Sequence, residues 1–173
     1  MKKIRRIVVG QNANNKSTIL EDSYAKDIEK FISGVDDAVS INLWATNSSP
    51  ANLKIDKDPT EFGVSFLPKT SGSIFRVCII PPDDSYIYRL DEILLNGEKV
   101  TEKQKKGKHP LMHKVDALVY GIILEGKVTL LTDTENTELK KGDTVIDCGS
   151  HHAWSNQTDS NCKIAFILID AVR

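Results

Sequence analysis

Short runs in which hydrophobic and polar residues alternate make up most of the chain. Residues 4–9 and 39–45 alternate with a period of two, which is typical of strands that bury one face. Residues 74–80 form a longer apolar run that ends at Pro81-Pro82, so we expect a buried strand there. Short strands at this spacing indicate a sandwich or a barrel. Further strands are expected at 17–20, 119–124, 127–131, 137–139, 144–146 and 163–169.

Helical periodicity is confined to two short segments. Within residues 23–32, Tyr24, Ile28 and Phe31 stand at helical spacing, which fits one short helix or a turn. Residues 90–95 form a second amphipathic piece, which we expect as a helical turn over the mouth of the barrel. Residues 46–73 are rich in Ser, Pro, Asp, Asn and Gly and should form a long surface segment. The pattern therefore predicts a mainly β chain with one or two short helices.

The number of domains and the connections between strands can be predicted from the tight turns and from the lack of an internal repeat. Glu125-Gly126 and Lys141-Gly142-Asp143 read as turns between strands, because glycine adopts the positive φ that other residues resist. The sequence does not repeat itself, which predicts one barrel. We expect residues 76–173 to form this barrel. Residues 1–75 should supply N-terminal strands and a long loop that pack on it, within a single structural domain.

The composition narrows the classes of partner. The chain has 173 residues, 27% of them charged, and a net charge of −1, so no global field would attract nucleic acid or an anionic membrane. The basic run 103–108 lacks interleaved aromatic residues and is expected to be a solvated loop. Its apolar runs are far shorter than the ~20 residues of a membrane helix, and no secretory signal pattern follows the first residue. Three cysteines without a C-x-x-C motif favour the cytoplasm.

Two glycine-anchored motifs carry the candidate chemistry. The first runs from Gly107 through His113 to Gly126, and the second runs from Gly142 through His152 to Asn156. Imidazoles in such positions can bind a divalent metal or form hydrogen bonds with an organic ligand.

These motifs resemble those of the small single-domain cupins, and more closely those of a bacterial and fungal group of cupin-domain proteins. The resemblance implies an all-β cupin-type jelly-roll β-barrel with an N-terminal strand extension, often assembled as a homodimer. It also implies a divalent metal (Fe, Mn, Ni or Zn) held by three histidines and one acidic residue. The residues that carry it are His109-Pro110-Leu111-Met112-His113, Leu124-Glu125-Gly126, His152-Ala153-Trp154-Ser155-Asn156 and 164–169.

The chain departs from this pattern at two of the four ligand positions. Val115 stands where the resemblance places a second histidine, and Val119 stands where it places the acidic ligand. His113 and His152 remain as metal-ligand candidates, with Asp116 and His109 as weaker ones. A metal held by so few ligands should show low occupancy.

The same departures favour an organic ligand. We expect a pocket lined by Tyr120, Trp154, Val115 and Val119, in which the aromatic rings stack on a ligand and the valines make the walls apolar. The leading hypothesis is a cytoplasmic cupin-fold protein that binds a small organic molecule in its barrel. The alternative is a metal-dependent oxygenase, isomerase or decarboxylase with a reduced, histidine-only site. The sequence assigns no catalytic residue and does not decide whether the protein is an enzyme.

Overall fold

Fourteen strands and three short helices make up the part of the chain that the computed structural model describes, residues 3–54, 57–61 and 63–173. The helices are the 3-10 turns η1 (Asp83–Ser85) and η2 (Ile87–Arg89) and the single α-helix α1 (Glu102–Lys106). The strands are β1 (Arg5–Gln11), β2 (Ser17–Tyr24), β3 (Ile28–Lys30), β4 (Val39–Thr46), β5 (Ser73–Ile80), β6 (Leu94–Leu95), β7 (Glu98–Lys99), β8 (His113–Lys114), β9 (Leu118–Glu125), β10 (Lys127–Thr132), β11 (Asn136–Lys140), β12 (Thr144–Cys148), β13 (His151–Ser155) and β14 (Cys162–Ile169).

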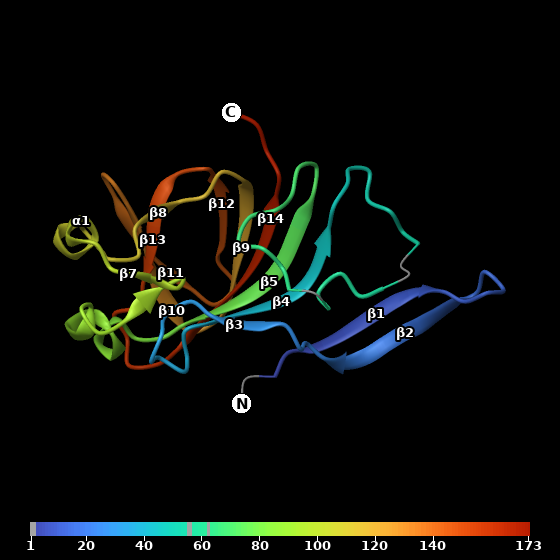
Figure 1. The fold of residues 1–173 in the computed structure, drawn as a ribbon, viewed down its shortest axis with the longest axis horizontal. Helices are drawn as coiled ribbons and strands as arrows, with labels where there is room; N and C mark the ends of the chain where they lie inside the picture. The colour runs from blue at the N-terminus through green and yellow to red at the C-terminus, as the bar shows by residue number, and fades with distance from the viewer. Residues whose placement is uncertain (1–2, 55–56, 62) are drawn as a thin grey trace.

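Two antiparallel sheets form the body of the protein. One has six strands in the order β12-β9-β14-β5-β4-β3, and the other has four in the order β11-β10-β13-β8. Figure 1 shows the two sheets facing each other across a common interior. The mainly β fold with few short helices, predicted from the alternating pattern, is confirmed.

The core lies between the two sheets, and strand alternation decides which side chains enter it. On β14, Ile164, Phe166 and Leu168 point inward and join side chains from β10, β11 and β13. Ala165, between them, belongs to a second apolar cluster on the outer face of the six-stranded sheet. Each large side chain that is fully buried in this way contributes about 1.5–3 kcal/mol to stability.

The N-terminal hairpin stands apart from the two large sheets. Strands β1 and β2 pair only with each other in the described part of the chain, and the hairpin projects beyond the barrel in Figure 1. The expected boundary at residue 75 falls inside β5, and β3 and β4 share a sheet with the barrel strands. The segment that precedes the expected boundary therefore contributes two strands to the six-stranded sheet.

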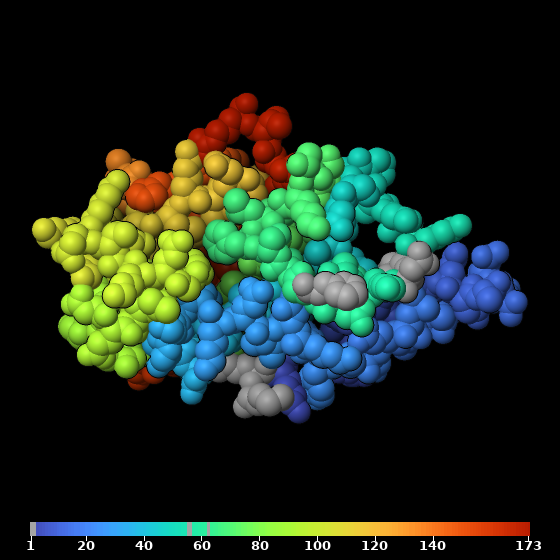
Figure 2. Space-filling model, in the orientation of Figure 1, coloured from blue at the N-terminus to red at the C-terminus, as the bar shows by residue number. Residues whose placement is uncertain are grey.

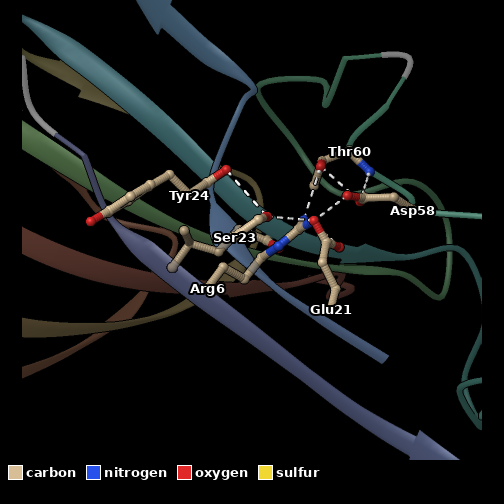
Figure 3. A network of polar contacts seen from close by, with 7 residues as sticks. Arg6, Glu21, Ser23, Tyr24, Asp58 and Thr60 are labelled. Atoms are coloured by element: carbon tan, nitrogen blue, oxygen red, sulfur yellow. Dashed lines mark hydrogen bonds and ion pairs between the residues drawn. The ribbon is translucent and has the colours of Figure 1, made fainter. Parts of the chain in front are cut away.

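A buried arginine ties the long loop to this hairpin (Figure 3). Arg6 donates to Glu21 Oε2 at 2.6 Å, donates to Thr60 Oγ1 at 3.2 Å and forms an ion pair with Asp58. Asp58 Oδ1 in turn accepts from the backbone N–H of Thr60 at 2.8 Å. Residues 58–60 are thus held against β1 and β2. In Figure 2, the green segment after residue 63 continues across the front of the barrel.

Three local predictions were wrong. Residues 23–32 do not form a helix, because Ile28 pairs with Ile41 and residues 28–30 join the six-stranded sheet as β3. Within 90–95 the structure has strand β6, and the helical turn η2 ends before it. The basic run does contain a helix, α1, because Thr101 and Gln104 form a reciprocal capping box at its start.

Candidate functional site

The two candidate histidines lie side by side on neighbouring strands. His113 on β8 and His152 on β13 are direct partners in the sheet, and their ring centroids are 4.6 Å apart. His152 is almost fully buried, whereas His113 is partly buried. His151, the next residue along β13, is exposed and its Nδ1 lies 2.7 Å from Asp133 Oδ1. Strand alternation therefore turns only one of these two adjacent histidines toward His113.

The hydrogen bonds of the two rings fix which nitrogens carry protons. His113 Nδ1 lies 2.8 Å from the carbonyl oxygen of Leu111. His152 Nδ1 lies 3.2 Å from the carbonyl oxygen of Ser150 and 3.2 Å from Asp147 Oδ2. These oxygens can only accept, so each Nδ1 is the donor and each neutral ring keeps a lone pair on Nε2. The site thus offers two adjacent imidazole acceptors.

Burial keeps His113 neutral. The loss of hydration lowers the pKa of His113 below its usual value, and the neighbouring charge of a protonated His152 would lower it further. A neutral imidazole is the form that accepts a hydrogen bond or binds a metal through Nε2.

Aromatic side chains line the approach to the histidines. The Phe66 ring, from the long loop, makes an edge contact with His113 at 6.2 Å between centroids. On the other side, Trp154 contacts His152 at 5.9 Å and Phe166 at 5.3 Å. This series of rings runs from the loop into the core and provides an apolar wall next to the two acceptors.

The other two positions of the expected metal set are filled by core side chains. Val115 and Val119 are 4% and 7% exposed and pack into the apolar cluster between the sheets. Hydrocarbon side chains cannot bind a metal ion. Within the described residues, no group of three or more His, Cys, Asp or Glu side chains is arranged to hold a metal. The residues present therefore do not fit the four-ligand metal set that the sequence resemblance implies.

The structure places the two weaker ligand candidates elsewhere. Asp116 is exposed, and Arg173 donates to its Oδ1 at 2.6 Å. His109 is buried with Asp83: its Nε2 lies 3.3 Å from Asp83 Oδ2, and the backbone N–H of Leu111 donates to its Nδ1. The carboxylate of Asp116 and the imidazole of His109 are engaged in these contacts, so neither residue joins the His113–His152 pair.

One expected pocket residue, Tyr120, points away from the interior of the barrel. Tyr120 alternates with Val119 and Gly121 along β9, so its side chain lies on the outer face of the six-stranded sheet and is 37% exposed. Its neighbours across the sheet are Ile146 and Ile167. Of the four expected lining residues, Tyr120 is the correction: it lies outside the interior that Val115, Val119 and Trp154 occupy.

Sequence reasoning missed Asp147 and Phe66 as neighbours of the histidines. Asp147 is buried at the end of β12; its Oδ2 lies 3.2 Å from His152 Nδ1 but forms no well-aligned hydrogen bond within the described residues. The only signal was its place in the second motif, between Gly142 and His152. Phe66 lies in the long loop far from both motifs, and no pattern in the sequence connects it to His113.

A buried carboxylate outside the motifs organises the end of β13. Asp83 accepts from Tyr86 Oη at 2.9 Å, from Ser155 Oγ at 2.6 Å and from the backbone N–H of Asn156 at 3.0 Å. Burial opposes the charge of Asp83, but the hydrogen bonds, first of all that of His109, hold its pKa below the usual value. This network fixes the strand that carries His152.

The comparisons with known proteins give similarity at low identity. No family model matches the chain. The chain is 28% identical over 130 residues to a phomopsin biosynthesis cluster protein D of Diaporthe leptostromiformis, a match that covers 74% of this chain. It spans 59% of the length of that relative, and the same share of a second protein of that cluster.

Solved structures similar to the chain are cupin-domain proteins. The cupin domain of Schizosaccharomyces pombe Cnp3 has a TM-score of 0.45 and 8% identity, over 99% of this chain and 89% of that one. A cupin 2 conserved barrel domain protein of Salinispora arenicola has a TM-score of 0.37 and 16% identity, over 57% of this chain and 64% of that one. In the described residues, no helix has the length and apolarity needed to cross a membrane. The chain has a mainly β fold by its own strands, and the two solved structures named above, to which it is similar, are cupin domains.

Proposed function

We propose that the protein binds a small organic molecule in a cupin-type barrel, at the His113–His152 pair. The observation that carries this proposal is the pair of adjacent imidazoles, whose centroids lie 4.6 Å apart and whose Nδ1 atoms both face oxygen acceptors, which leaves the Nε2 atoms as the acceptors of the neutral rings. Two acceptors next to each other suit a ligand with hydroxyl or N–H donors. The rings of Phe66 and Trp154 would cover its apolar part.

The metal-dependent alternative would use the same two Nε2 atoms as ligands. It lacks support from the other side chains, because Val115 and Val119 occupy the remaining positions of the set. A metal content measurement separates the two functions. The organic-ligand proposal expects less than about 0.1 equivalent of Fe, Mn, Ni or Zn after loading and desalting, since a site with two protein ligands holds metal weakly. Near-stoichiometric metal that disappears in a His113→Ala/His152→Ala variant would establish the alternative.

The binding experiment uses the same double variant. A panel of small alcohols, amides and hydroxy acids is screened for a rise in the midpoint of thermal unfolding, because a ligand that binds only the native state stabilises it. At a concentration of about 100 Kd, the stabilisation is about 2.7 kcal/mol. We expect the rise in wild type and in a His151→Ala control, whose imidazole is exposed beside Asp133, and no rise in the double variant. An equal rise in all three proteins would place the ligand elsewhere and refute the proposal.

Two further expectations are retained as proposals. We propose a cytoplasmic setting, which is supported by the three free cysteines Cys78, Cys148 and Cys162. We also propose a homodimer, supported by apolar side chains that remain exposed on the outer face of the six-stranded sheet, among them Phe75, Tyr120 and Ile146.

A further inference from the structure

An arginine lies inside the barrel, on the inner face of the six-stranded sheet. Along β5, Arg76 lies an even number of residues from Ile74 and Ile80, so it shares their face of the strand. Both isoleucines pack into the core between the sheets. Its partner across the sheet on β14 is Phe166, a residue of the same core. The arginine is only 4% exposed. Its guanidinium is therefore largely removed from water.

Most of the hydrogen-bonding capacity of this guanidinium is unused. Nη2 donates to the carbonyl oxygen of Ser65 at 2.7 Å, while the buried Nε has no hydrogen-bond partner. Within the described residues, Arg76 forms no ion pair. The Phe66 ring covers one side, with its centroid 5.9 Å from Cζ. A buried guanidinium with one neutral partner is costly, because a charge in a low dielectric is stable only when it is paired.

The pKa of Arg76 reflects this cost. Burial lowers it below its ordinary value, and the carboxylates of Glu29 and Asp27 compensate only in part. Asp27 is committed elsewhere: its Oδ2 accepts from Asn42 Nδ2 at 2.9 Å and from the backbone N–H of Val64 at 3.1 Å. The described residues thus supply no direct counter-ion at this point.

A second unpaired polar atom lies directly opposite Arg76. Asn42 on β4 is its register partner, so the two side chains share one face of the sheet. Asn42 is fully buried, and its Oδ1 has no hydrogen-bond partner. Buried polar atoms of this kind are normally satisfied by protein, by water or by a ligand. Here a charged donor and a neutral acceptor are left open on adjacent strands.

These two residues are connected to the histidine pair through Phe66. The same ring contacts His113, at 6.2 Å between centroids, and Arg76, at 5.9 Å from its Cζ. Phe66 thus lies between two polar pairs: Arg76 with its register partner Asn42, and His113 with its register partner His152. Together they offer one cationic donor and three acceptors, Asn42 Oδ1 and the Nε2 atoms of the two neutral imidazoles. A matching ligand carries one anionic group and one or more hydroxyl groups.

We propose that the ligand is a small hydroxy-monocarboxylic acid, with its carboxylate held by Arg76 and its hydroxyl donating to Asn42 Oδ1 or to a histidine Nε2. This inference rests on the proposed function and names the class of ligand for it. A guanidinium matches a carboxylate with two parallel N–H···O bonds. One guanidinium neutralises one negative charge, and the acidic groups Asp27 and Glu29 would repel a dianion such as phosphate. The rings of Phe66, Trp154 and Phe166 suit a ligand with an apolar body.

Three related probes separate the contributions of charge and hydroxyl. Phenyllactate has both groups, phenyllactamide lacks the charge, and hydrocinnamate lacks the hydroxyl. Calorimetry on wild type is expected to give the tightest binding for phenyllactate, with phenyllactamide about tenfold or more weaker, since a hydrogen bond to a charged group contributes about 1.5–3 kcal/mol. In Arg76→Gln, phenyllactate and phenyllactamide should bind equally weakly.

A matched control variant and an NMR measurement on wild type separate a loss of binding from a misfolded Arg76→Gln variant. Arg89→Gln removes an exposed arginine whose Nη2 also donates to a backbone carbonyl, that of Ser85 at 3.0 Å, and should leave all three affinities unchanged. In wild type, the ¹⁵N–¹H signal of Arg76 Nε should shift on addition of phenyllactate and stay in place with phenyllactamide. This second measurement needs no variant.

The outcomes distinguish this inference from the proposed function. Equal affinity of wild type for phenyllactate and phenyllactamide, an unchanged Nε signal, or no binding of any probe overturns the role of Arg76. If the probes then still bind in a manner that requires His113 and His152, the proposed function stands with a neutral ligand. Phenyllactate binding that depends on Arg76 and persists in the His113→Ala/His152→Ala variant would instead place the ligand away from the histidines, which overturns the proposed function.

Discussion

Replacing Asp83 tests whether the buried network at the end of β13 holds the barrel together. Asp83 accepts hydrogen bonds from Tyr86, Ser155 and the backbone of Asn156, and these three residues are at most 2% exposed. Asp83→Ala would leave all three donors in a dry environment without their acceptor. Each unsatisfied buried donor costs about 1–3 kcal/mol, although the two hydroxyl groups can rotate toward other acceptors. We therefore expect a loss of about 3–5 kcal/mol in the free energy of unfolding.

Asp83→Asn should be the milder change. The amide keeps one oxygen for Tyr86 and Asn156, but its NH₂ group faces the Nε2–H of His109, since Leu111 already donates to Nδ1 of that ring. We expect a loss of about 1.5–3 kcal/mol, which is the usual worth of a hydrogen bond to a charged group. The neighbouring Asp84→Ala is the control, because Asp84 is exposed and surface substitutions stay within about 0.5 kcal/mol.

Urea unfolding at pH 7 and at lower pH measures these differences. The pKa of Asp83 is lowered in the native state, so between this value and the unfolded value of about 3.9 the unfolded chain binds more protons. The stabilisation by Asp83 is therefore present above about pH 3.9 and disappears as the pH falls through its native pKa. Asp83→Asn should lose this part of the acid dependence. A loss below about 1 kcal/mol for Asp83→Ala, or an unchanged acid limb in Asp83→Asn, would refute the reasoning.

Three other measurements address the site, the turns and the assembly. The imidazole of His113 should titrate with a midpoint below about 6.5 in an NMR pH series, because burial lowers its pKa; a midpoint above this value would contradict the neutral acceptor. Both Gly126→Ala and Gly142→Ala strain a positive φ, but only at Gly126 would the new Cβ stand 2.7 Å from a backbone oxygen. We expect about 1 kcal/mol for Gly142→Ala and at least about 1 kcal/mol more for Gly126→Ala in urea unfolding, and equal losses would show that the contact relaxes freely. Ile146→Glu and Phe75→Glu should convert the proposed homodimer to a monomer in light scattering at matched concentration, and a mass that equals that of wild type would exclude this face as the interface.

Local patterns were sufficient for the strands and the turns. The predicted strands at 39–45, 74–80, 119–124 and 163–169 correspond to β4, β5, β9 and β14 within one residue at each end. Alternation is a property of neighbouring residues, and so is the positive φ of Gly126 and Gly142 at the predicted turns. The two motif histidines were selected through the resemblance to the cupin motifs, which is also carried by short stretches of the chain.

The wrong predictions concern residues whose conformation or orientation depends on a partner that is distant in sequence. Residues 23–32 have a helical pattern, but pairing with β4 makes three of them a strand. Tyr120 was expected inside because it is aromatic and lies near the first motif, whereas the register of β9 against β12 and β14 turns it outward. A shift of one residue moves every side chain of a strand to the other face, and the register is set by the partner strand.

The sequence by itself determined the mainly β class and most strand positions, because these follow from the pattern of a few neighbouring residues. The candidate histidines came from the resemblance of two short motifs to those of cupins. Only the tertiary structure decided which polar groups are buried and what they face. Arg76, Asp83 and Asp147 look like ordinary charged residues in the chain, and each is at most 8% exposed in the fold. Their environment is built by strands and loops that lie far away in sequence. Asp83 finds a full set of partners there, whereas Arg76 does not, and a buried charged group without its partners is the one that points to a ligand.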